Sequence, residues 1–311
     1  MISWRANFMK VMAAGQAQRH LRILAAVAGG ALVLAGCGSS GSTPSKSSSQ
    51  RSAGQAIARA AYVSSSASGY RVAINFQEGS SALGGDITGA GGGSFNLPKH
   101  AGRVSLSLSL PGSLSSAGTL HVQEILDGQT AYVKLPAQVA NQLPGSRPWI
   151  KLNLNQMGRA AGIQNLTSLF GGSGSTNPSQ FLQYLRTTSS SGVTKVGTGS
   201  VDGVLATHYH ATINLAKAPA AAPAAERASM RQAVATLQKL TGLHAIPVDV
   251  WVDSQHLVRR LTMAYTVRAS GQSLRTQIRL DFLSYGSQPV PKAPPAKQVT
   301  DAGSLLGKLK K

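Results

Sequence analysis

The most constraining feature of this sequence is a strict alternation between residues 104 and 110. Val104, Leu106, Leu108 and Leu110 are apolar, and serines lie between them. Successive side chains of a β-strand point to opposite faces, so this pattern predicts a strand with one apolar and one hydroxylated face. Such a strand belongs in a sheet that is covered on its apolar face and meets water on the other.

The same alternation recurs through much of the chain. Further strands are predicted at 72–77, 120–126, 131–135, 148–152, 195–200, 204–215, 246–252, 261–267 and 278–282. Asp-Gly pairs at 127–128 and 202–203 separate neighbouring strands and are typical of hairpin turns. Because most strands are joined by short turns, we expect one antiparallel sheet. The glycine-rich stretch 84–93 is expected to be a mobile loop with a short strand inside.

Helical spacing is confined to short segments. Residues 53–66 and 226–240 each predict an amphipathic helix, and Asn177-Pro178 marks the start of another. The predicted fold class is therefore α+β, a curved antiparallel β-sheet (half-barrel) with short helices packed in its concave face. Short helices could leave an apolar cavity beside them. A tightly packed core without a cavity is the alternative, and it stays open at this point.

The N-terminal segment indicates the compartment. Residues 1–22 hold four basic and no acidic residues, and residues 23–34 are all apolar or glycine. This apolar run is shorter than the roughly 20 residues of a membrane-spanning helix, but it has the length of a signal-peptide core. Leu34-Ala35-Gly36-Cys37 follows, and Cys37 is the only cysteine of the chain.

Together these elements resemble a bacterial lipoprotein precursor. The resemblance implies that residues 1–36 are a signal peptide and that Cys37 carries the lipid attachment. Residues 37–52 are Ser-rich and are expected to be a flexible tether. Residues 53–288 form the folded domain, and the Pro- and Lys-rich residues 289–311 form an extended, poorly ordered tail. The protein is therefore expected to be extracytoplasmic, lipid-anchored to the outer face of the cell membrane.

A second resemblance concerns the domain and is clearest in its C-terminal half. The motifs that carry it are Val201-Asp202-Gly203-Val204 with His208-Tyr209, Ile246-Pro247-Val248-Asp249-Val250-Trp251-Val252-Asp253, Leu257-Val258-Arg259-Arg260-Leu261 and Asp281-Phe282-Leu283-Ser284-Tyr285-Gly286. With them, residues 53–295 resemble the LolA-like half-barrel lipoproteins of actinobacteria, the LppX/LprG type. The resemblance implies a curved sheet that binds a lipid or lipoglycan in its concavity. The chain departs from the pattern at the stretches 84–93 and 171–176.

The apolar side of the strands would then line the ligand cavity. The residues expected to line it are Ile74, Phe76, Leu106, Leu108, Val250, Met263, Tyr265 and Leu280. The leading prediction is a membrane-anchored, non-enzymatic protein that binds or carries a lipid or lipoglycan and needs no cofactor. The alternative is an envelope sensor or protein-interaction module with a filled core, whose partner is another envelope protein.

Two histidines are the only candidate metal ligands that the pattern brings together. His208 and His210 share one face of a predicted strand. Zinc sites need at least three protein ligands, and no third ligand is indicated near them. A solvated pair is therefore expected, and no metal site is predicted.

Candidate catalytic residues are equally weak. Asp249 and Asp253 share one parity of a strand, and paired carboxylates can perform acid–base chemistry. Arg259 and Arg260 are, however, ready cross-strand partners for them. The chain also lacks a Gly-x-Ser-x-Gly nucleophile motif. No catalytic residue is predicted.

The positive charge of the chain invites a nucleic-acid partner. The net charge is +20, and removal of residues 1–36 with their four basic residues lowers it to +16. Nucleic-acid binders cluster their basic residues, and single-strand binders add aromatic platforms. Here the basic residues are scattered and only 5% of residues are aromatic. No nucleic acid is expected. Anionic lipid headgroups and glycolipids are better partners, and solubility explains the charge equally well.

Overall fold

The structure is a computed structural model. It describes residues 46–80, 85–112, 118–141, 145–153, 182, 185, 192–221, 224, 227–269 and 272–302. They all belong to one compact unit, Pro44–Lys311. The predicted signal peptide, Cys37 and the predicted helix start at Asn177 lie outside the described residues. Leu182 and Leu185, which follow that start, are helical and buried. In the described part of the chain, no helix is long and apolar enough to cross a membrane.

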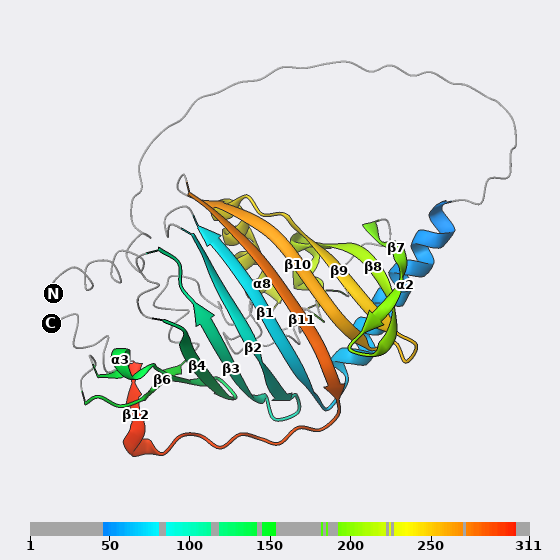
Figure 1. The fold of residues 1–311 in the computed structure, drawn as a ribbon. Helices are drawn as coiled ribbons and strands as arrows, with labels where there is room; N and C mark the ends of the chain where they lie inside the picture. The colour runs from blue at the N-terminus through cyan, green and yellow to red at the C-terminus, as the bar shows by residue number, and fades with distance from the viewer. Residues whose placement is uncertain are drawn as a thin grey trace, which may run out of the picture. The chain divides into compact units, whose positions relative to one another are not determined.

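The described strands form one open sheet in the order β12-β6-β5-β4-β3-β2-β1-β11-β10-β9-β8-β7. They are β1 (Gly69–Ser80), β2 (Gly85–Asn96), β3 (Ala101–Ser109), β4 (Leu120–Asp127), β5 (Thr130–Lys134), β6 (Trp149–Asn153), β7 (Thr194–Val201), β8 (Val204–Asn214), β9 (Ala245–Asp253), β10 (Val258–Ala269), β11 (Gln272–Tyr285) and β12 (Val299–Asp301). All neighbours are antiparallel except β12 and β6. Figure 1 shows the strands side by side in a curved, twisted sheet. The predicted α+β class and curved antiparallel sheet are confirmed.

Both predicted hairpins are present. β4 turns into β5 at Gly128, whose φ is 57°, and β7 turns into β8 at Asp202 and Gly203, whose φ values are 47° and 82°. Tight hairpin turns need such left-handed residues, which Gly and Asp adopt at low cost. The turns therefore set the register of these two strand pairs.

The described part of the glycine-rich stretch, residues 85–93, is not the mobile loop that the composition suggested. It belongs to a full strand, β2, paired on both sides with β1 and β3. A Cβ at Gly91 would collide with the carbonyl oxygen of Ser105 on β3, and one at Gly89 would collide with the ring of Phe76. Glycine in a strand marks such close approaches. The glycines therefore permit the pairing that their weak strand propensity concealed.

The two ends of the domain differ from the expectation. Helix α2 (Lys46–Ser65) begins before residue 53, so it takes up part of the stretch expected to be a tether. After β11 the chain has no regular structure over residues 287–295, and then β12 pairs in parallel with β6. Prolines keep this segment extended, and the edge of β6 offers free backbone partners. The expected tail thus contributes a strand to the sheet.

Helices α2 and α8 (Arg227–Thr241) pack on one face of the sheet, which we call the inner face; the opposite face is the outer face. α2 contacts β7, β9 and β10, and α8 contacts β10 (Figure 1). Ile57 of α2 and Val234 of α8 join the same buried core as Leu261 of β10. The shorter helices are α3 (Ala137–Ala140), η4 (Leu215–Lys217), α7 (Ala218–Ala221) and η6 (Ala296–Gln298). The helices predicted over 53–66 and 226–240 are therefore present and cover the apolar side.

Hydrogen bonds fasten α2 to the sheet. The backbone N–H of Val258 donates to the buried Ser64 Oγ at 2.9 Å, and Tyr285 Oη donates to the carbonyl of Val258 at 2.6 Å. Burial raises the pKa of Tyr285, and nearby Asp253 adds to the rise, while Ser64 and Arg259 oppose it. The Tyr285 hydroxyl therefore stays protonated and holds its bond beneath the helix.

Candidate ligand-binding face

Two rows of apolar residues cross the inner face, each following the strand register. One row runs Val250, Leu261, Leu280, Ile74, Gly91, Leu106 and Val122, and the next runs Val248, Met263, Ile278, Phe76, Gly89, Leu108 and Leu120. Directly opposed residues of neighbouring strands lie within side-chain contact distance. The two rows therefore form one apolar strip, which crosses the sheet from β9 to β4.

The strip is buried at one end only. At the β9–β10 end, Val248, Val250 and Leu261 are 0% exposed and Met263 is 3% exposed, beneath the helices. At the other end, Leu106 and Leu108 of β3 and Leu120 and Val122 of β4 are half-buried. We call these last four residues the β3–β4 patch. Together with the half-buried Phe76 and Ile278 of the second row, it keeps apolar surface of the strip available.

All eight residues predicted to line a cavity lie on the inner face. Ile74, Val250, Met263 and Leu280 belong to the buried core, whereas Phe76, Leu106, Leu108 and Tyr265 are half-buried. The structure thus brings them onto one surface but divides them into packed and partly accessible residues. Their role as a ligand lining stays a prediction. Leu120 and Val122 were missed, although they share the parity of the buried Leu126.

A polar row follows the apolar strip. Tyr265, Thr276 and Glu78 are directly opposed across β10, β11 and β1. Thr276 is only 3% exposed, and its side chain hydrogen-bonds to Tyr265. Burial raises the pKa of Tyr265; the hydrogen bond to Thr276 opposes the rise and the charge of Glu78 adds to it. The row therefore places hydrogen-bonding groups beside the apolar surface.

The histidine pair lies on the outer face, away from the strip. His208 Nε2 and His210 Nδ1 contact the same oxygen of Asp249, Oδ1, at 2.9 and 3.1 Å. The ring of His208 stacks on Trp251 with a centroid distance of 4.1 Å. The shared face was predicted correctly, but the two rings are tied to Asp249 rather than only solvated. Among the described residues, no cluster of three or more groups suited to a metal ion occurs.

Asp253, the second aspartate of the candidate catalytic pair, has a structural role. Asp253 is 6% exposed and accepts two backbone N–H groups of the β9–β10 turn. Its other oxygen accepts from Arg259 Nε at 2.6 Å, as the predicted pairing requires. Arg260, expected to pair with these aspartates, instead pairs with Asp281 on β11, which lies directly opposite it. Asp253 therefore fastens a turn, and its oxygens are already engaged.

No family model and no curated protein matches this sequence. Among solved structures, the chain is similar to the Mycobacterium tuberculosis lipoprotein LppX, with 15% identity and a TM-score of 0.41 over 77% of this chain and 97% of that one. It is also similar to LprF from Mycobacterium bovis, with 10% identity and a TM-score of 0.43 over 78% and 96%. A putative outer membrane lipoprotein-sorting protein domain from Vibrio parahaemolyticus matches at 7% identity and a TM-score of 0.23, over 78% and 95%.

Proposed function

We propose that this chain is a membrane-anchored, non-enzymatic protein that holds the acyl chains of a lipid or lipoglycan on its inner face. The observation that carries the proposal is the β3–β4 patch, in which four large apolar side chains remain half-buried on two paired strands. Each Å² of apolar surface removed from water contributes about 25 cal/mol. An acyl chain laid on the patch would gain this energy.

The rest of the inner face gives the ligand a direction. From the β3–β4 patch the apolar strip continues across the sheet to Phe76. The polar row of Tyr265, Thr276 and Glu78 lies beside the strip, two residues further along each strand. A lipid has the same order of apolar and polar parts. We place the acyl chains along the strip and the headgroup at the polar row, where hydroxyl and carboxylate groups can pair with it.

The predicted lipid at Cys37 would keep the domain near its source of ligand. Only residues 38–45 separate Cys37 from the start of α2. An extended chain gains at most about 3.5 Å per residue, so this segment reaches roughly 30 Å. The domain would therefore work close to the membrane surface.

Native mass spectrometry of the protein purified from membranes in mild detergent tests the proposal. We expect a co-purified lipid in the unaltered protein and its loss from the double variant Leu106→Asn, Leu108→Asn. The matched control is Ser105→Asn, on the exposed outer side of the same strand, which should keep the lipid. A correctly folded protein that never carries lipid would contradict the proposal.

A filled core is the observation that favours the alternative, an envelope sensor or protein-interaction module. The β9–β10 end of the strip is fully packed against helices. If the same packing extended over the whole inner face in solution, a partner would bind elsewhere on the protein. Crosslinking in intact cells that yields one stoichiometric membrane protein, together with a lipid-free domain, would support this alternative.

A further inference from the structure

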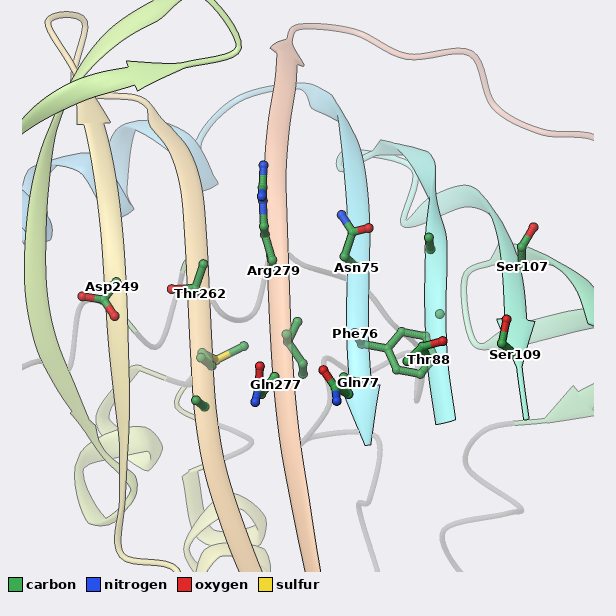
Figure 2. A pocket seen from close by; sticks show the side chains of 15 residues that line it. Asn75, Phe76, Gln77, Thr88, Ser107, Ser109, Asp249, Thr262, Gln277 and Arg279 are labelled. Carbon is green, nitrogen blue, oxygen red and sulfur yellow. The ribbon is translucent and has the colours of Figure 1, made fainter. Parts of the chain in front are cut away.

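A separate hollow lies on the outer face, with a volume of about 660 Å³. Two rows of side chains bound it, and each row follows the strand register (Figure 2). The first row is Asp249, Thr262, Arg279, Asn75, Ala90 and Ser107, and the second is Ala264, Gln277, Gln77, Thr88 and Ser109. The floor is formed by Met263, Ile278, Phe76 and Gly89, which have the parity of the inner face. We call this hollow the outer trough.

The trough runs across the strands rather than along them. It extends from β9 to β3 over six neighbouring strands, and a spacing of about 4.8 Å per strand gives it a length of roughly 24 Å. The backbone of its floor is already paired within the sheet. A ligand in the trough must therefore form its hydrogen bonds with the side chains of the two rows.

These side chains offer donors and acceptors in similar measure. The amides of Asn75 and Gln277 can each donate and accept, and the hydroxyls of Thr88, Thr262 and Ser109 do the same. Gln77 Nε2 donates to Asp86 and Ser107 Oγ contacts His121 Nδ1, so these two side chains offer their remaining atoms. Ala90 and Ala264 leave room at their positions in the two rows because their side chains are small. Such a lining suits a ligand that carries many hydroxyl groups.

The charged groups of the trough are held by neighbouring side chains. Asp249 contacts His208 and His210 through one oxygen, and Arg279 Nε donates to the buried Asp281 at 2.7 Å. The contacts hold the carboxylate and the guanidinium in place, so their remaining hydrogen-bonding atoms are pre-organised. Asp281 also pairs with Arg260, so this group of two arginines and one aspartate keeps one net positive charge, which the negative charge of Asp249 in the same row offsets. The trough therefore favours a neutral ligand, although the chain as a whole is strongly basic.

We propose that the outer trough binds a neutral, linear oligosaccharide. Polar side chains line both walls, which disfavours an acyl chain. A peptide strand would need an unpaired sheet edge for its backbone, and the trough crosses strands that are all paired. An anionic polymer would need uncompensated basic groups. The site lies on the face opposite the apolar strip, so an oligosaccharide and a lipid would occupy different faces of the sheet.

Isothermal titration of the full protein in detergent tests this site. The probes are neutral hexasaccharides of glucose, of galactose and of mannose, with hexagalacturonate as the anionic comparison. At least one neutral hexasaccharide should bind with a Kd below about 1 mM, and its affinity should not change between low and high salt because the ligand carries no charge.

Two variants test whether the oligosaccharide binds in the trough. Ala264→Trp fills it and should weaken binding about tenfold, which corresponds to about 1.4 kcal/mol. Thr266→Trp is the matched control, because Thr266 is exposed on the same face of β10 but outside the trough; it should bind like the unaltered protein. Should Ala264→Trp disturb the circular dichroism spectrum, Asn75→Leu serves instead, since Asn75 is exposed and loses only its polar group.

Three results would overturn the proposal. They are the absence of binding by every neutral hexasaccharide at about 10 mM, salt-sensitive binding of hexagalacturonate alone, and equal affinities for the trough variants and the Thr266→Trp control. Lipid occupancy measured on the same samples separates this proposal from the lipid hypothesis. A trough variant that loses the oligosaccharide and keeps its lipid supports two independent sites.

Discussion

Two strand pairs of the inner face carry similar residues in different surroundings. On β9 and β10, Val248, Val250, Leu261 and Met263 are 0–3% exposed, whereas the four residues of the β3–β4 patch are half-buried. Both pairs are antiparallel and both alternate apolar with polar residues. The difference comes from the helices, which contact β9 and β10. Alternation therefore specifies which face is apolar, but not whether protein or ligand covers it.

The largest expected effect tests this contrast directly. Leu261→Ala should lower the free energy of unfolding by about 3 kcal/mol, because it leaves a cavity among fully buried neighbours. Leu106→Ala, the same change in the β3–β4 patch, should cost about 1 kcal/mol, because part of that side chain already meets water. Urea unfolding of lipid-free protein measures both. Equal losses would show that the two regions are packed alike.

A second prediction concerns the turn that closes the β9–β10 pair. Asp253→Asn should lower the free energy of unfolding by about 2 kcal/mol, because the buried carboxylate accepts two backbone N–H groups and Arg259. Asp249→Asn is the control, with a loss below about 1 kcal/mol, since its side chain is 36% exposed. If both variants lost the same amount, Asp253 would not be the group that secures this end of the sheet.

Much of this fold could be predicted because strand and turn signals are local. The alternation of residues 104–110 and the Asp-Gly turns predicted the strands and hairpins that the structure contains. β2 was not predicted as a full strand. Its glycines are needed for close approach to β1 and β3, and the sequence of the strand alone does not reveal such a contact. β12 was not predicted because it pairs with the free edge of β6, which is far away in the sequence.

The candidate sites were less predictable because they depend on register. Parity placed all eight expected lining residues on one face, but it does not tell which of them are buried; among the described helices, α2 and α8 cover the buried ones on β9 and β10. The outer trough needs Asp249, Arg279 and Ser107 in a single row across six strands. Each of these residues alone looks like an ordinary solvent-facing strand residue. No local pattern could have joined them.

The smallest expected effect compares two tyrosines through their pH dependence. Burial raises the pKa of both Tyr285, beneath α2, and Tyr265, in the polar row, and the rise is larger at Tyr285. A tyrosine whose folded pKa lies above the unfolded value of 10.0 stabilises the protein fully below pH 10. That contribution is lost as the pH rises further, because only the unfolded chain can then release the proton.

Stability should therefore fall above pH 10, and Tyr285→Phe should make the fall shallower by at most about 1.4 kcal/mol per pH unit. Tyr265→Phe should reduce the steepness of this fall by a smaller amount. Urea unfolding at a series of pH values on both sides of 10 gives the slopes, and the unaltered protein corrects for other alkaline titrations. Tyr285→Phe also removes the bond to the Val258 carbonyl, which lowers stability at every pH and leaves the slope comparison intact. If Tyr265→Phe flattened the curve as much as Tyr285→Phe, the polar row would be as well covered as the residues beneath α2, and it could not receive a headgroup.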